Sequence, residues 1–87
     1  MADTVKIDLE GALAGRHIVV DPDQLDIGLL EDIQSPKFAD TLDGLARCIV
    51  NGNLPHGYDR AGLRRLKLAE LQALVKGVDG QFAMPKS

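Results

Sequence analysis

The stretch FADTLDGLARCIV, residues 38–50, carries the most regular hydrophobic pattern of the chain. Its apolar side chains recur at steps of three and four residues: Phe38, Leu42, Leu45 and Ile49, with Ala46 and Val50 beside them. Because a helical turn takes about 3.6 residues, this spacing predicts an amphipathic helix with one face on a hydrophobic core. Ser35 and Pro36 are suited to cap its start, and the Asn-Gly-Asn segment 51–53 is a typical helix end.

Upstream of this helix the hydrophobic period changes to that of a strand. The apolar residues of segment 4–9 alternate with polar ones, which is typical of a half-buried strand. A turn rich in small residues at 11–15 separates this segment from the β-branched stretch 16–20, which stops at Asp21. A β-hairpin over residues 4–20 is the simplest interpretation.

Two further helices are expected, one on each side of the central helix. Between residues 25 and 33 an apolar side chain recurs every four residues, and Asp21 or Asp23 can cap the start of this helix. After a polar loop, Asp59 can cap a short turn. The segment from Leu66 onward then places four apolar residues on one helical face: Leu71, Leu74, Val75 and Val78.

Together these patterns predict an α+β fold that is mainly α, with a short N-terminal β-hairpin followed by about three packed helices. A chain of 87 residues has room for one hydrophobic core, so we expect a single compact domain over residues 1–78. Residues 79–87 lose the helical period and contain Gly80 and Pro85, which predicts a flexible C-terminal tail. A core this small gives modest stability, so we expect a homo-oligomer or a protein partner to add to it.

The composition argues against several functional classes. Cys48 is the only cysteine, so no internal disulfide can form, and a reducing cytoplasm is the expected location. The N-terminus carries acids where an export signal has a basic and then an apolar region, and no apolar run reaches membrane-spanning length. The formal net charge of −3 argues against binding that depends on neutralising nucleic-acid phosphates. We therefore expect a soluble, cytoplasmic protein.

The sequence shows no recognisable catalytic, metal or cofactor site. His17 and His56 lack a second ligand at helical spacing, and Cys48 has no neighbouring base to activate its thiol. The acids of segment 21–26 lack the central glycine and terminal acid of a calcium loop, and helix capping explains them better. The glycines of segment 11–15 lack the Lys-Ser or Lys-Thr of a phosphate-binding loop. The sequence therefore predicts a non-enzymatic protein with no metal and no cofactor.

One basic cluster leaves a nucleic-acid-associated regulatory function open as an alternative. The cluster consists of Arg60, Arg64, Arg65 and Lys67. The segment GLRRLKLAELQALVKGV, residues 62–78, is similar to the short helical SAP-type DNA-binding motif. The same leucine spacing is equally typical of a surface helix whose apolar side packs inward, and the acidic net charge weakens the nucleic-acid interpretation.

The order of segments along the chain supplies a further hypothesis. The segments are VKIDLEG, HIVVD, LDIGLLEDIQ, KFADTLDGLARCIVNG and LRRLKLAELQALVKGV, within residues 4–78. A strand-rich start, successive helices and a closing leucine-rich helix resemble the small tail assembly chaperones of long-tailed phages. The resemblance implies a non-enzymatic protein, in the host cytoplasm if it is phage-encoded, that binds the tape-measure protein during tail formation. It also implies a protein that is absent from the finished particle and can act as an oligomer.

A chaperone of this kind needs an apolar strip outside its own core, which can cover apolar positions on a partner helix. The candidate partner-binding residues are Leu29, Leu30, Ile33, Leu68 and Leu71. The alternative is that all five belong to the core. A structural subunit of a phage or of another complex is the third functional class that the sequence leaves open.

Overall fold

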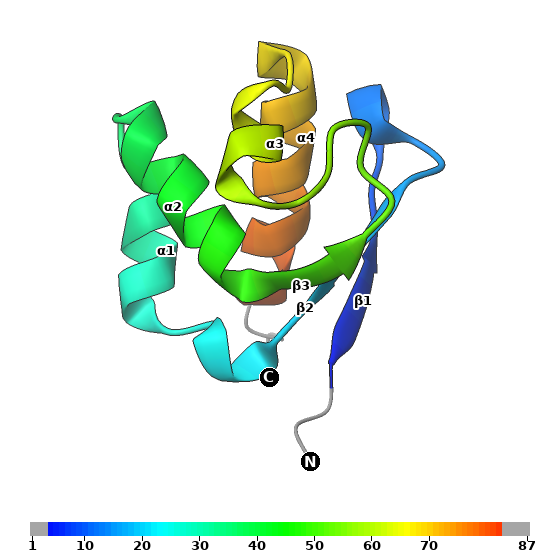
Figure 1. Cartoon of the computed structure of the whole chain (residues 1–87). Helices are drawn as coiled ribbons and strands as arrows, with labels where there is room; N and C mark the ends of the chain where they lie inside the picture. Colours follow the sequence, from blue (N-terminus) through cyan, green and yellow to red (C-terminus); the bar gives the residue numbers. More distant parts are fainter. Residues whose placement is uncertain (1–3, 83–87) are drawn as a thin grey trace.

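The computed structural model describes residues 4–82, which form one antiparallel sheet and four α-helices (Figure 1). The strands are β1 (Val5–Asp8), β2 (His17–Val20) and β3 (Ile49–Gly52). The helices are α1 (Ile27–Ile33), α2 (Phe38–Cys48), α3 (Arg60–Arg64) and α4 (Leu68–Asp79). Short 3-10 turns occupy Gly11–Leu13, Pro22–Gln24 and Gly80–Phe82. The predicted α+β class is confirmed, with four helices in the described residues where about three were expected.

The predicted N-terminal hairpin is confirmed by the pairing of β1 with β2. The two strands are antiparallel, with Val5 opposite Val20 and Ile7 opposite Ile18. Alternation puts Ile7, Ile18 and Val20 on the inner face of the sheet, where all three are buried. The hairpin connection is anchored by Leu13, which is 1% exposed.

The central helix is shorter than its hydrophobic pattern predicted. α2 ends at Cys48, and Ile49 continues in extended conformation as the first residue of β3. β3 pairs antiparallel with β2, and the Asp21 N–H donates to the Cys48 carbonyl at 3.0 Å. Ile49 remains buried, but Val50 is exposed and does not widen the core stripe. The predicted helix end at 51–53 is therefore wrong, because β-branched residues 49 and 50 find an unpaired edge of β2.

The starts of α1 and α3 are capped by aspartates, whereas the N-cap of α2 is Lys37 and not the expected Ser35 or Pro36. Asp26 caps α1, since its Oδ1 accepts the Leu29 N–H at 2.8 Å. Asp21 caps the separate 3-10 turn that precedes α1, and Asp23 caps neither element. Asp59 caps α3 as predicted, by accepting the Gly62 N–H at 3.0 Å.

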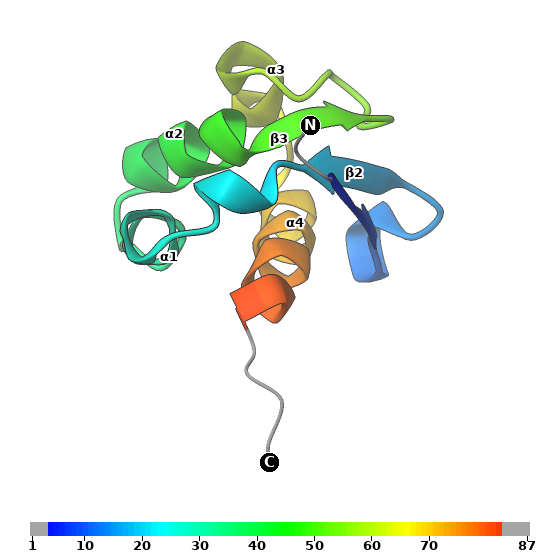
Figure 2. The ribbon, with the colours of Figure 1, turned by 90° about the horizontal axis from the view of Figure 1, so that it is seen from below.

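The hydrophobic core lies between the inner face of the sheet and the helices. Its fully buried side chains come from β2, the Gly11–Leu13 turn and the four helices: Leu13, Ile18, Val20, Leu29, Leu45, Cys48, Leu63, Leu74 and Val78. Figures 1 and 2 show α1 beside α2, with α4 placed between this pair and the hairpin. The close contact of α1 with α2 depends on Gly44, because a Cβ there would lie 3.0 Å from Leu29 Cδ1.

The first four residues of the predicted C-terminal tail, 79–82, are helical. α4 includes Asp79, and a 3-10 turn follows it at Gly80–Phe82. The Gln34 side-chain amide donates to the Asp79 carboxylate at 3.2 Å, which links the ends of α1 and α4. Residues 83–87 of the predicted tail lie outside the described residues.

We predict that Gly62→Ala lowers the free energy of unfolding by about 2–3 kcal/mol. A Cβ at this position would lie 2.1 Å from the His56 carbonyl oxygen, so the backbone of the 53–59 loop has to move. Urea denaturation followed by circular dichroism measures the change. Gly80→Ala is the matched control, because a Cβ there meets nothing within 4 Å and the backbone is helical. Equal stability of the two variants would contradict the prediction.

Candidate functional site

The five residues predicted to contact a partner do not form one surface. Leu29 and Ile33 are 0% and 3% exposed, so the expectation that they form an exposed strip is wrong. α2 and α4 cover the face of α1 that carries them. Leu71 is also buried, and Leu30 is half-buried against the core. Leu68 alone among the five is largely exposed, at 57%.

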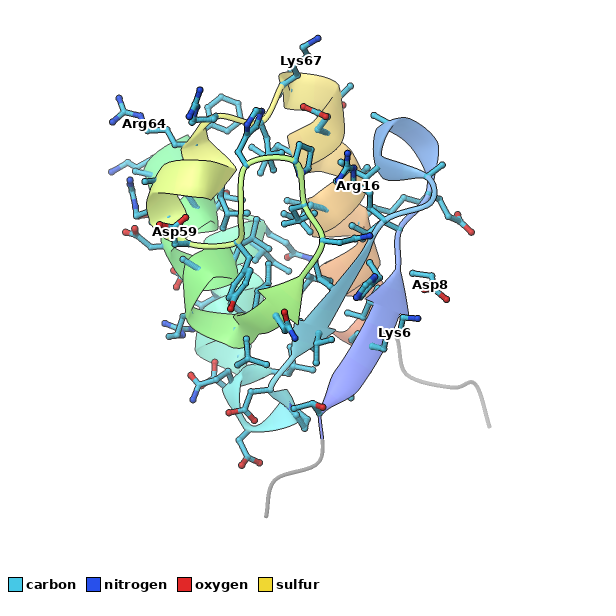
Figure 3. The ribbon with its side chains drawn as sticks, turned by 45° about the vertical axis from the view of Figure 1, so that its right-hand side comes forward. Lys6, Asp8, Arg16, Asp59, Arg64 and Lys67 are labelled. Atoms are coloured by element: carbon cyan, nitrogen blue, oxygen red, sulfur yellow. The ribbon has the colours of Figure 1, made fainter. Side chains whose placement is uncertain are left out.

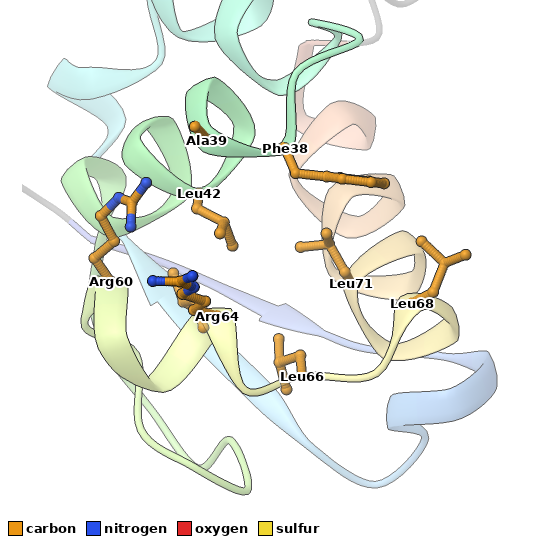
Figure 4. Close-up of a pocket in the computed structure, with 9 residues that line it drawn as sticks. Phe38, Ala39, Leu42, Arg60, Arg64, Leu66, Leu68 and Leu71 are labelled. Atoms are coloured by element: carbon orange, nitrogen blue, oxygen red, sulfur yellow. The ribbon is translucent and has the colours of Figure 1, made fainter.

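Leu68 and Leu71 belong instead to an apolar groove between α2, α3 and the start of α4 (Figure 4). The groove has a volume of about 520 Å³ and is lined by Phe38, Ala39, Leu42, Arg60, Leu63, Arg64, Leu66, Leu68 and Leu71. Phe38 is 60% exposed, so the groove has two large apolar side chains at its rim. Figure 4 shows Phe38 and Leu68 on one side and Arg60 and Arg64 on the other.

The exposure of these rim residues follows from their position at helix starts. Phe38 is the first residue of α2 and Leu68 the first residue of α4. Helical side chains tilt toward the N-terminus, so a side chain in the first position projects beyond its own helix. Ile27, the first residue of α1, is 68% exposed for the same reason.

Local hydrogen bonds fix both helix starts at the groove. The Ser35 hydroxyl accepts the Lys37 N–H at 3.1 Å and donates to the Asp40 carboxylate at 2.9 Å, which sets the turn before α2. The Lys67 N–H donates to Glu70 Oε1 at 2.8 Å, which sets the start of α4. The groove walls are therefore held by polar contacts that do not occupy the groove.

A second hollow extends the groove past Phe38 and Leu68. It has a volume of about 330 Å³ and is lined by Ile33, Ser35, Phe38, Thr41, Leu68, Leu71, Gln72 and Val75. Both hollows share Phe38, Leu68 and Leu71, so the two rim side chains stand between adjacent depressions. The combined apolar surface runs along residues 38–42 of α2 and residues 68–75 of α4.

The predicted basic cluster is divided by the structure. Arg60 Nε donates to Asp43 Oδ1 and so ties α3 to α2. Arg64 lines the groove, and Arg65 and Lys67 are exposed in the connection to α4. In the part of the chain from 4 to 82, Arg64, Arg65 and Lys67 form no ion pair with an acidic side chain. Their positive charge remains available beside the apolar surface.

Cys48 is a core residue. Its side chain is 0% exposed, and its thiol donates to the Leu45 carbonyl oxygen at 3.5 Å. Burial raises the pKa of the thiol from 9.0 to about 11, while its backbone hydrogen bond and the nearby Arg47 oppose this rise. A nucleophilic thiolate is disfavoured at this position.

Neither a metal-ligand cluster nor a helix fit to span a membrane occurs within the described residues. Over residues 4–82, no group of three or more His, Cys, Asp or Glu side chains is placed to hold a metal ion. None of the helices in that range is both long and apolar enough to cross a membrane. Comparisons with protein families, with curated protein sequences and with solved structures find no significant match.

Sequence reasoning missed Phe38 as a site residue because it fits the core stripe of α2. Its spacing to Leu42 is that of two residues on one helical face. The signal that distinguishes it is its place next to the Ser35-Pro36 turn, which makes it the first helical residue. Leu68 is likewise the first residue of its helix. It follows Lys67, whose N–H donates to the Glu70 side chain.

We predict that burial of Cys48 makes the protein less stable as the pH rises from 9.0 toward 11. As the pH rises, the Cys48 thiol loses its proton in the unfolded chain before it does so in the folded chain. The free energy of unfolding is therefore unaffected below the pKa of the unfolded chain, and above it falls by at most about 1.4 kcal/mol per pH unit. Urea denaturation over this range, with Cys48→Ala as control, isolates the effect. Cys48→Ala is expected to be less stable at every pH, but its free energy of unfolding should lack the fall that comes from thiol ionisation. If the free energies of unfolding of both proteins depend on pH in the same way, the prediction is contradicted.

Proposed function

We propose that this protein is a non-enzymatic assembly chaperone of the phage tail type, which binds a helical segment of a tape-measure protein. The observation that carries this proposal is the exposure of Phe38 and Leu68 at the rim of an apolar groove. A groove between helices, with large apolar anchors, suits an amphipathic helix that inserts residues spaced by three and four. A chaperone acting this way covers apolar side chains of its partner until assembly buries them.

The charges beside the groove define the expected partner further. Arg64 lies at the groove and is not engaged by an acidic side chain of residues 4–82. A partner helix with an acidic residue next to its apolar face would therefore gain charge-assisted contacts at this end. Binding in the host cytoplasm, and release before the particle is complete, belong to the same proposal.

The basic cluster gives less support to a nucleic-acid function. Arg60 is already paired with Asp43, and the surface next to Arg64 is apolar. Nucleic-acid binding depends on several basic side chains that reach phosphates together, and the net charge of the chain is −3. The proposed chaperone differs from a structural subunit in that it leaves the finished assembly.

We predict that Phe38→Ser and Leu68→Ser each weaken binding to a tape-measure fragment by at least about tenfold, because each removes a large apolar anchor. Co-expression followed by size-exclusion chromatography and a binding titration measures the loss. Ile27→Ser is the matched control: Ile27 is also an exposed first helical residue but lies outside both hollows. If the unmodified chain neither co-elutes with the fragment nor improves its solubility, the proposed function is wrong.

We predict that Arg64→Glu weakens binding to an acidic partner helix, and that the difference from the unmodified chain shrinks as salt is raised. Titrations of the same fragment at low and moderate salt measure this. A parallel titration with duplex DNA tests the alternative function. Binding to DNA that is steeply salt-dependent and lost in Arg64→Ala/Arg65→Ala would favour the nucleic-acid function instead.

A further inference from the structure

β1 is an open edge of the sheet. The strand order is β1-β2-β3, so within residues 4–82 β1 has a neighbouring strand on one side only. The Leu9 N–H donates to the Arg16 carbonyl at 2.9 Å, which makes these two residues a hydrogen-bonded pair. Because such pairs alternate along an antiparallel ladder, Ile7 bonds inward to β2, whereas the backbone groups of Lys6 and Asp8 point outward. With respect to the rest of the described chain, the outward backbone groups of Lys6 and Asp8 are therefore not hydrogen-bonded.

At the opposite edge of the sheet, one outward backbone donor is occupied by a side chain. The Asn53 N–H donates to the His17 carbonyl at 3.2 Å, so the same alternation turns the Gly52 N–H away from β2. Asn51 Oδ1 accepts this outward N–H at 2.8 Å. An edge whose donor is already occupied is a poor template for another strand, and the two edges of this sheet therefore differ.

We propose that β1 pairs antiparallel with β1 of a second copy of this chain, with the two-fold axis at Ile7. In this register Lys6 lies opposite Asp8 of the second copy, and Asp8 lies opposite Lys6 of the second copy. These are the residues whose backbone groups point outward, so one register satisfies both the hydrogen bonds and the charges. A single Lys on an edge strand discourages pairing, but Lys and Asp two residues apart complement themselves about a two-fold axis.

The side chains of Lys6 and Asp8 are free to make the new contacts. Their side chains are 63% and 84% exposed and touch each other at 3.8 Å, an arrangement that contributes little to the stability of one chain. Figure 3 shows both side chains on the outer side of the sheet. Opposite-charge pairs between strands would replace this weak contact.

The inner side of β1 also fits a second strand. A hollow of about 410 Å³ lies between β1, the Gly11 turn and α4, and Ile7 forms part of its wall. The proposed register places Val5, which is half-buried, opposite Leu9 of the second copy on this side. Ile7 and Leu9 are already buried within one chain, so Val5 is the inward-facing apolar side chain of β1 that pairing would cover further. This surface shares no residue with the groove and does not depend on the proposed function.

Charge reversal at β1 tests the pairing. We expect sedimentation velocity of the full chain over a concentration series to show a monomer–dimer equilibrium. By symmetry, Lys6→Glu or Asp8→Lys converts both cross-strand pairs to like charges, so each weakens the dimer by about tenfold or more. The double variant Lys6→Asp/Asp8→Lys restores opposite pairs and restores the dimer. Circular dichroism checks that each variant folds.

Amide hydrogen exchange tests the surface and the register directly. The Lys6 and Asp8 N–H groups are expected to gain protection as the concentration rises, while the Gly52 N–H keeps the protection that Asn51 gives it. A chain that stays monomeric at the highest concentration overturns the inference. So does a dimer that both single reversals leave unchanged, or one that forms without added protection at Lys6 and Asp8.

Discussion

The junction between Cys48 and Ile49 is the constraint on which the rest of the structure depends. The chain passes there from α2 into β3 without a loop, and the Cys48 carbonyl accepts the Asp21 N–H at 3.0 Å. Both junction side chains are buried, so the end of α2 cannot shift relative to the sheet without opening the core. The helical layer and the sheet are therefore set in one relative position. The start of α2, with Phe38, is placed beside α4 as a result.

Much of the fold could be predicted from hydrophobic period, and the departures have specific physical causes. The pattern of α2 correctly placed Ile49 in the core, but burial of Ile49 is compatible with either a helix or a strand. The choice is made by β2, which lies some thirty residues earlier in the chain and offers an unpaired edge. A local pattern does not contain that information. The cap at Asp26 is likewise hard to predict, because the 3-10 turn before α1 has no hydrophobic period of its own.

The candidate site was harder to predict than the fold, because exposure depends on neighbouring elements. Leu29 and Leu68 both lie on apolar helical faces in the sequence, yet one is fully buried and the other largely exposed. The difference arises because α2 covers α1 along its length, whereas Leu68 precedes the part of α4 that packs on the core. The availability of the basic cluster likewise depends on neighbouring elements. Its four side chains are close in sequence, but Asp43 on α2 takes up one of them in an ion pair.

The two proposed surfaces lie on different elements, and this separation has a consequence for binding. The groove is formed by α2, α3 and the residues that lead into α4, whereas the dimer contact is made by β1. A dimer formed through β1 would therefore leave both grooves free. An elongated helical partner with repeated apolar segments could then occupy two grooves at once, so the second contact would form at a high effective concentration. Modest affinity at each groove would suffice to hold such a partner, and loss of one contact would allow stepwise release during assembly.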